Sequence, residues 1–400
     1  MVFGLALAQF GLFIGLLAPV TVSLALKTQT LVPGDRATEV NGSVLSVAAL
    51  LAVVANPLFG RLSDLTLSRF GRRRPWMLGG AVVFLASLIV VGLAPNVTTL
   101  LLGWCAAQLS GNAILAPLLA TIADQVAPAQ RGTVSANVGV MQNVANLASA
   151  YVAGWFVDDM LMLFALPALF AVATIACYCF LLPDRPLSNR PDLGGWQVFL
   201  RTFWVSPRKH PDFAWVWVSR FLVILAQFLF ITFRLFFLEH SIGLSTREAV
   251  QTLSTGILIY TIALVLFAKL AGLLSDRMRR RKPFVIASTL LFALGMIVLA
   301  HSGTVTAFFV AEAVLGAGYG AYVAVDTALV IDVLPNPDDS AKDLGVLNIA
   351  NALPQSLAGG VGALLLSLGS GGSHYTALYW GAGIFGVLGA LAIVPIRSVK

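Results

Sequence analysis

Four ionisable residues lie inside long apolar stretches, where charge is costly and usually serves a function. Arg220 and Arg234 occupy one stretch, and Glu312 and Asp326 occupy another. The members of each stretch are 14 residues apart, which on a helix is about 21 Å of rise and nearly the same face. Two antiparallel helices with this spacing would form two ion pairs, Arg220 with Asp326 and Arg234 with Glu312.

Two interpretations of these charges remain open. In the first, each pair neutralises itself and ties two helices together. In the second, Asp326 or Glu312 takes up a proton on one side of a membrane and releases it on the other. Asp326 is the first candidate for this coupling acid, and Glu312 is the second.

Neutral amides and tyrosines form a second group of candidates. Such amides either join helices or bind a polar solute, and a sugar suits neutral amides and aromatic faces. Spacings of three and four place several of them on shared helix faces. The residues that could line a polar cavity are Gln108, Asn112, Gln142, Asn146, Gln227, Tyr319, Tyr322, Asn348, Asn351 and Gln355.

A third group joins aspartates at predicted helix ends to the arginines that follow them. An aspartate at a helix C-terminus faces the negative end of the dipole, and arginines beyond it can neutralise the carboxylate. We expect Asp64 to pair with Arg69, Arg72 or Arg73, and Asp276 with Arg277 or Arg279. The alternative is that these basic loops only fix the orientation of the chain. The group comprises Gly60, Asp64, Arg69, Arg72, Arg73, Asp124, Arg131, Asp276 and Arg277.

The elements that position these residues must cross a membrane. Of the 400 residues, 58% are apolar and only 11% are charged, against about 25% charged in an ordinary soluble domain. This composition excludes a soluble enzyme, a nucleic-acid-binding protein and a disordered chain. A membrane helix needs about 20 apolar residues, so the length fits an all-helical protein with twelve transmembrane helices.

Apolar runs broken by proline, glycine or charge predict the helix positions. The expected helices are 3–26, 41–63, 76–94, 98–124, 133–157, 163–182, 213–238, 249–274, 284–301, 304–331, 344–368 and 374–396. The longest polar connection follows the sixth helix. The predicted domains are therefore a bundle over 1–182, a cytoplasmic linker over 183–212 and a second bundle over 213–400.

Charge distribution predicts the orientation and the partners. Most of the 25 Lys and Arg fall in loops on one side, so both termini are expected in the cytoplasm and the protein in the bacterial inner membrane. The expected partners are a small-molecule substrate, a coupling proton and the lipid bilayer. We expect no nucleic acid, no metal and no cofactor, since the four His make no metal pattern and no P-loop occurs. The protein is expected to act as a monomer.

The two halves of the sequence resemble each other. One predicted helix ends Gly60-Arg61-Leu62-Ser63-Asp64 before a basic loop that ends Arg74-Pro75. Its counterpart ends Gly272-Leu273-Leu274-Ser275-Asp276 before a loop that ends Lys282-Pro283. Asp124 and Asp332 end two further helices at nearly the same offset. These landmarks indicate a parallel duplication of six helices.

The loop from Gly60 to Pro75 is similar to the loop signature of the major facilitator superfamily, and the resemblance covers essentially the whole chain. Its longer form, ending Ser68-Arg69-Phe70-Gly71-Arg72-Arg73-Arg74-Pro75, resembles the glycoside–pentoside–hexuronide cation symporters and the sucrose transporters. The motifs Asp326-x-Ala328-Leu329, Leu334-Pro335 and Asn348-x-x-Asn351-x-x-Pro354-Gln355 fit that branch as well. The resemblance implies two six-helix bundles, a midplane cavity, alternating access and loop clusters that latch the halves together.

The sequence also departs from these families. Leu65 stands where most members have arginine, and Gln108 stands where plant sucrose carriers have an acid. No acid precedes Asp64 in its helix, whereas melibiose-type sodium carriers use acids there, so a proton is favoured over sodium. We expect proton-coupled symport of a sugar or glycoside. The alternatives are a proton-driven exporter of hydrophobic or drug-like compounds and a non-transporting membrane sensor or scaffold. None of these is an enzyme.

Overall fold

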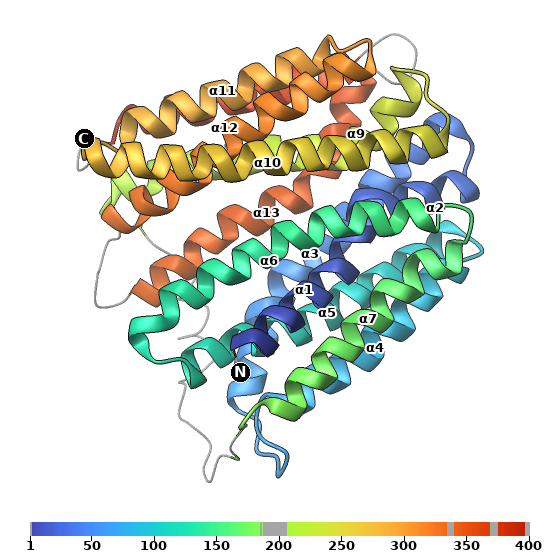
Figure 1. Ribbon diagram of the computed structural model, residues 1–400, viewed down its shortest axis with the longest axis vertical. Helices are drawn as coiled ribbons and strands as arrows, with labels where there is room; N and C mark the ends of the chain where they lie inside the picture. Colours follow the sequence, from blue (N-terminus) through green and yellow to red (C-terminus); the bar gives the residue numbers. More distant parts are fainter. Residues whose placement is uncertain (1, 185, 187–205, 334–339, 369–374, 397–400) are drawn as a thin grey trace. The chain divides into compact units, whose positions relative to one another are not determined.

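A computed structural model describes residues 2–184, 186, 206–333, 340–368 and 375–396 of the chain (Figure 1). Every regular element within these ranges is a helix. Eleven of the described helical segments are long and apolar enough to cross a membrane. The predicted all-helical membrane fold is confirmed. The chain divides into two compact units, Met1–Leu193 and Gly194–Lys400, and each is described by itself.

The first unit contains six long helical rods within its described residues. The first rod is continuous through three segments, and the others are single helices. They are α1 (Val2–Ala18), η1 (Pro19–Ser23) and α2 (Leu24–Leu31), followed by α3 (Gly34–Asp64), α4 (Arg74–Leu93), α5 (Val97–Gln125), α6 (Pro128–Trp155) and α7 (Met160–Leu181).

The first two rods differ from their predicted bounds. The first was expected to end at residue 26 but continues to Leu31. As predicted, it runs through Pro19, which lies in a π-helical turn from Pro19 to Ser23. The second was expected from residue 41 but begins at Gly34, directly after Pro33. The expectation that no acid precedes Asp64 in its helix was therefore wrong, because Asp35 and Glu39 lie in the first turns of α3. The first rod ends because Val32, the residue before Pro33, has an extended backbone.

The second unit repeats the pattern with six helices in its described part. They are α9 (Pro211–His240), α10 (Thr246–Met278), α11 (Lys282–Ala300), α12 (Val305–Asp332), α13 (Ser340–Ser367) and α14 (Tyr375–Ile393). Of the predicted linker 183–212, the structure describes only residues 183, 184, 186 and 206–212.

The two units pack their helices in the same way. α5 packs on α3 and α4. In the same way α12 packs on both α10 and α11, and these three helices run alongside one another in Figure 1. α4 contacts α7 as α11 contacts α14. The first rod contacts α6 and α7 as α9 contacts α13 and α14. This shared pattern confirms the predicted parallel duplication.

Glycines allow α12 to approach its neighbours closely. A Cβ atom on Gly316 would meet the backbone carbonyl of Tyr260 in α10, and one on Gly318 would meet the backbone of Phe292 in α11. Gly320 has a similarly close backbone neighbour in α10. The glycine-rich stretch therefore serves helix packing, as expected from its place inside an apolar helix.

Candidate functional site

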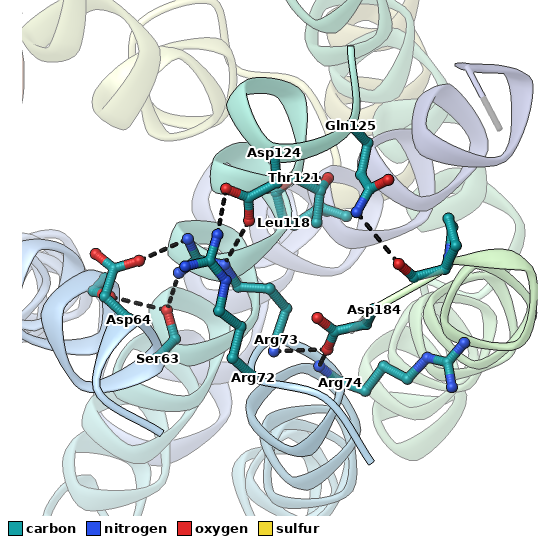
Figure 2. Close-up of polar contacts among 12 residues, drawn as sticks. Ser63, Asp64, Arg72, Arg73, Arg74, Leu118, Thr121, Asp124, Gln125 and Asp184 are labelled. Carbon is teal, nitrogen blue, oxygen red and sulfur yellow. Dashed lines mark hydrogen bonds and ion pairs between the residues drawn. The ribbon is translucent and has the colours of Figure 1, made fainter. Parts of the chain in front are cut away.

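A network of charged side chains connects three helix ends in the first unit (Figure 2). Arg73 lies at the N-terminus of α4 and forms ion pairs with Asp64 of α3 at 2.6 Å and with Asp124 of α5 at 3.0 Å. Its Nη1 also donates to the Ser63 hydroxyl at 2.5 Å. Arg72 pairs with the second oxygen of Asp124 at 2.5 Å. The network thus ties the C-termini of α3 and α5 to the start of α4.

Burial makes this network stronger than an ordinary surface salt bridge. The Arg73 side chain is only 5% exposed, while the side chains of Asp64 and Asp124 are 36% and 18% exposed. Charge-assisted hydrogen bonds are about twice as strong as neutral ones, and partial burial reduces their screening. Of the cations expected beside Asp64, the structure selects Arg73.

Asp184, which sequence reasoning missed, completes the first turn of α4. Its Oδ2 accepts hydrogen bonds from the backbone N–H groups of Arg73 at 2.7 Å and Arg74 at 2.9 Å (Figure 2). A carboxylate at a helix N-terminus satisfies free donors and complements the positive end of the dipole. Gly71 makes room for it, with φ of 97° and no space for a Cβ beside the carboxylate.

The basic loop of the second unit uses a different arginine from the predicted ones. Arg281 occupies the N-cap of α11, as Arg73 does for α4. It forms an ion pair with Asp276 and donates to the Ser275 hydroxyl at 3.1 Å. The predicted partners of Asp276 were wrong. Arg279 ends α10 in the left-handed conformation, with φ of 50°, and this turn brings Arg281 back to the helix end.

A further pair of cations holds equivalent places in the two units. Arg74, in the first turn of α4, donates to the carbonyl of Leu182 just beyond α7. Lys282, in the first turn of α11, donates to the carbonyls of Val394 and Ile396 just beyond α14. Each cation therefore satisfies acceptors at a helix C-terminus, where positive charge is favourable.

The other members of the predicted loop group whose side chains are described are Gly60, Arg69 and Arg277, and none of them joins an ion pair in the described part of the chain. A Cβ atom on Gly60 would lie 3.9 Å from the Cβ of Ala116, so packing in this structure does not require glycine. Arg69 is exposed and stacks over the Phe70 ring at 4.7 Å. Arg277 is exposed. The side chain of Arg131 lies outside the described residues.

Both predicted ion pairs inside the second unit are present. In the inner pair, nearer the start of α9, Arg220 Nη1 lies 3.3 Å from Asp326 Oδ2. Arg220 Nε also donates to the Asn351 side chain on α13 at 2.9 Å. Asp326 is 2% exposed, whereas Arg220 is 21% exposed. The second carboxylate oxygen of Asp326 is buried and makes no hydrogen bond of ordinary distance and angle among the described residues. The Tyr322 side chain on the same helix interacts with this carboxylate.

The outer pair is closed, in the sense that its two side chains face each other and are buried from solvent. Arg234 Nη1 lies 3.2 and 3.4 Å from the two carboxylate oxygens of Glu312. Both side chains are buried, at 2% and 0% exposure. The Arg234 guanidinium also lies over the Phe230 ring, 4.5 Å from its centre, which adds a cation–π contact.

The first-unit amides mainly join helices. The Asn112 side chain donates to the backbone carbonyl of Gln108 at 2.9 Å and accepts from Asn56 at 3.0 Å, which links α5 to α3. Gln108 and Asn112 are buried. On α6, Gln142 is exposed and Asn146 is half-buried. The structure does not bring these two pairs into hydrogen-bond contact among its described residues.

In the second unit, the candidates lie near the ion pairs. Gln227 donates to the Tyr260 hydroxyl at 2.9 Å. The rings of Tyr319 and Tyr322 are 6.0 Å apart on α12, about two turns and one turn from Asp326 respectively. Gln355 is half-buried on α13. The side chain of Asn348 lies outside the described residues. Asn351 accepts a hydrogen bond directly from Arg220, the partly exposed cation of the inner ion pair.

A helical fold with duplicated bundles and buried charges defines a membrane transport protein rather than an enzyme. The family model of the Major Facilitator Superfamily matches residues 1–269 and 247–400. The chain belongs to the Major Facilitator Superfamily.

Comparisons with individual proteins agree with this membership. An uncharacterized symporter, sll1374 of a Synechocystis species, is 51% identical over 43 residues, which are 11% of this chain and 8% of that protein. A solved structure of the nucleoside transporter NupG, a point mutant, has a TM-score of 0.78 at 15% identity and covers 99% of both chains. A D-xylose-proton symporter has a TM-score of 0.70 at 18% identity, over 98% of this chain and 96% of that one. These structures share the fold.

Proposed function

We propose that the chain is a proton-coupled symporter of a sugar or glycoside. The arginine-rich loop, the amides of the second unit and the fold shared with a D-xylose-proton symporter support this proposal. In the proposed setting, the protein lies in the bacterial inner membrane as a monomer, with both termini in the cytoplasm. A proton is preferred to sodium because the charged groups inside the second unit form arginine–carboxylate pairs.

The inner ion pair carries the proposal. Arg220 divides its donors between Asp326 and Asn351, and Asp326 keeps one buried oxygen that makes no hydrogen bond of ordinary geometry among the described residues. A proton on that oxygen would neutralise Asp326 and weaken its hold on Arg220. Arg220 and Asn351 could then turn their donors to a hydroxylated solute. Proton uptake and solute binding would thereby favour each other.

Neutral polar groups around this pair suit a sugar. Hydroxyl groups of a sugar accept from arginine and amide donors, and its apolar face stacks on aromatic rings. Asn351 supplies the amide, while Tyr319 and Tyr322 on α12 supply rings near Asp326. An exporter of drug-like compounds would instead be served by an apolar aromatic pocket without a shared arginine.

The loop networks are the proposed gate. The Arg73 network holds the ends of α3, α4 and α5 together, and Arg281 performs the corresponding task in the second unit. Alternating access requires contacts at such ends to form and break as the protein changes state. We assign to these two networks the role of stabilising one access state over the other.

Uptake into proteoliposomes tests the proposal. The purified chain is reconstituted and supplied with labelled D-xylose, D-glucose, sucrose or uridine, with the outside more acidic than the inside. We expect accumulation of at least one sugar that collapses with a protonophore, together with alkalinisation outside. If no sugar moves and an acid interior instead drives export of a lipophilic dye, the exporter is the correct assignment.

A further inference from the structure

The first turn of α4 separates two apolar crevices in the first unit. One crevice, of about 320 Å³, lies between α4 and α7 and includes Leu78 and Phe180 in its lining. The other, of about 610 Å³, is lined by α3, α4 and α5 and includes Trp76 and Gly79. Pro75 belongs to both linings, so one proline stands between two crevices.

Both crevices open on apolar surface of a membrane-spanning unit. Phe180 is 88% exposed, and Val83 in the second crevice is 51% exposed. From Pro75 to Val83 the helix rises about 12 Å, which is the length of a large part of an acyl chain. Exposed apolar side chains at this depth contact lipid tails rather than water. The crevices are therefore apolar grooves on the lipid-facing surface.

Two arginines lie where these crevices meet the basic loop. Arg69 stacks over the ring of Phe70, which lines the first crevice. Arg74 lines the same crevice, and its Nε is buried without a hydrogen-bond partner among the described residues. Neither arginine forms an ion pair with a carboxylate in the described part of the chain.

The neighbouring charges are already satisfied. Arg72 and Arg73 pair with Asp124 and Asp64, and Asp184 accepts from the backbone of the first turn. The loop therefore presents two arginines without a carboxylate partner in the described part of the chain, beside two apolar crevices. Arg74 also donates to the Leu182 carbonyl, which leaves its positive charge without a counter-charge. A free phosphate would use the cations and leave the crevices unused, and an uncharged lipid would use only the crevices.

We propose that the first turn of α4 binds one anionic phospholipid from the surrounding bilayer. Its phosphate lies between Arg69 and Arg74, and its two acyl chains lie on either side of Pro75, one in each crevice. Arginine forms charge-assisted hydrogen bonds with phosphate oxygens, and each cation near an anionic membrane surface adds about a fivefold preference for that lipid. The site is independent of the substrate and of the coupling ion.

Lipid retention measured by native mass spectrometry tests this site. The full chain is reconstituted in vesicles of equal parts phosphatidylglycerol and phosphatidylcholine with matched acyl chains, then released and weighed with its bound lipids. We expect the parent to retain phosphatidylglycerol in preference to phosphatidylcholine. Arg69→Gln with Arg74→Gln is expected to lower that preference by about 25-fold, to near unity. Arg69→Gln alone, on an exposed side chain, is expected to lower it by about fivefold.

A charge-matched control distinguishes the site from a generally basic surface. Arg279→Gln with Arg280→Gln removes the same charge from the other basic loop, where both residues are exposed, and is expected to leave the preference unchanged. Equal loss in this control would overturn the proposal. So would a parent that retains both lipids equally, or a double variant at Arg69 and Arg74 that keeps the parental ratio.

A steric variant tests the acyl-chain crevice separately. A Cβ atom on Gly79 would meet nothing within 4 Å, so Gly79→Leu fills the second crevice without disturbing the helix packing. We expect the variant to keep the parental melting temperature and to lose at least half of its retained phosphatidylglycerol. Full retention in a folded Gly79→Leu protein would contradict the placement of a chain in that crevice.

Discussion

The two units carry their charges at different depths, and the depth determines what each charge can do. In the first unit, the described ion pairs lie at the basic-loop ends of α3, α4 and α5. The second unit has one such loop pair, Arg281 with Asp276, and adds two pairs within α9 and α12, well inside the membrane-spanning segments. A pair at the loop can exchange its partner for water, whereas a pair inside the membrane cannot do so cheaply.

The two ion pairs within α9 and α12 differ from each other in how far their side chains are exposed. Arg234 and Glu312 are closed against each other and have almost no exposed surface. Arg220 is partly exposed and shares its donors with Asn351. A closed pair is suited to holding helices together, and a shared, partly open pair is suited to changing its protonation and its partners.

The largest expected effect is at the closed pair. Glu312→Ala leaves Arg234 buried without its counter-charge and should lower the free energy of unfolding by about 3–5 kcal/mol. Denaturant unfolding of the purified protein in detergent measures this. The double variant Arg234→Met with Glu312→Leu should recover most of the loss. A single variant within about 1 kcal/mol of the parent would show that the pair is not structural.

The next effect is at the open pair and concerns transport rather than folding. Asp326→Asn should reduce proton-driven accumulation at least tenfold, about 1.4 kcal/mol or more, while equilibrium exchange of the same sugar continues. Its cost in stability should be smaller than that of Glu312→Ala, because Arg220 retains Asn351 and some access to water. Accumulation at the parental level would remove Asp326 as the coupling acid and turn attention to Glu312.

The loop networks should show the effect of burial on a smaller scale. Arg73→Gln removes a nearly buried cation with three partners and should cost about 1.5–3 kcal/mol of unfolding free energy. Arg281→Gln removes a more exposed cation and should cost about 0.5–1 kcal/mol. Thermal unfolding of both variants under one condition makes the comparison. Equal losses would mean that exposure does not separate the two loops.

The smallest expected effect is at Gly60. Gly60→Ala places a methyl group at ordinary contact distance from Ala116 and should change stability by less than about 1 kcal/mol, in the stabilising direction. Gly316→Ala is the matched control and should destabilise by about 1–3 kcal/mol, because its Cβ meets the backbone of α10. If Gly60→Ala folds normally but transports at a lower rate, the glycine is needed for movement between states.

Periodicity and composition predicted most of the fold. Apolar runs separated by proline or charge located every long helix among the described residues. Each membrane crossing needs about 20 apolar residues and must satisfy its backbone hydrogen bonds within the helix. The ion pairs of α9 and α12 were predictable for a related reason. A charge inside an apolar span must find a partner at the same depth, and the spacing of 14 residues fixed those depths.

The missed features depend on backbone geometry or on distant contacts. Asp184 caps a helix that begins 110 residues earlier in the chain, so no local capping pattern could reveal it. Arg281 was missed because the left-handed residue at Arg279 changes which side chain returns to Asp276. The π-helical geometry at Pro19 was also not predicted, although the predicted helix 3–26 correctly continued through that proline.

The cap supplied by Asp184 bears on how the first half could be studied alone. A fragment that stops at residue 182, where the sequence placed the end of the bundle, would contain all six helices of the first unit but leave the N–H groups of Arg73 and Arg74 without this carboxylate. Extending the fragment by two residues restores the acceptor. The functional boundary of the first bundle therefore lies in its own connecting segment, beyond the last helical residue.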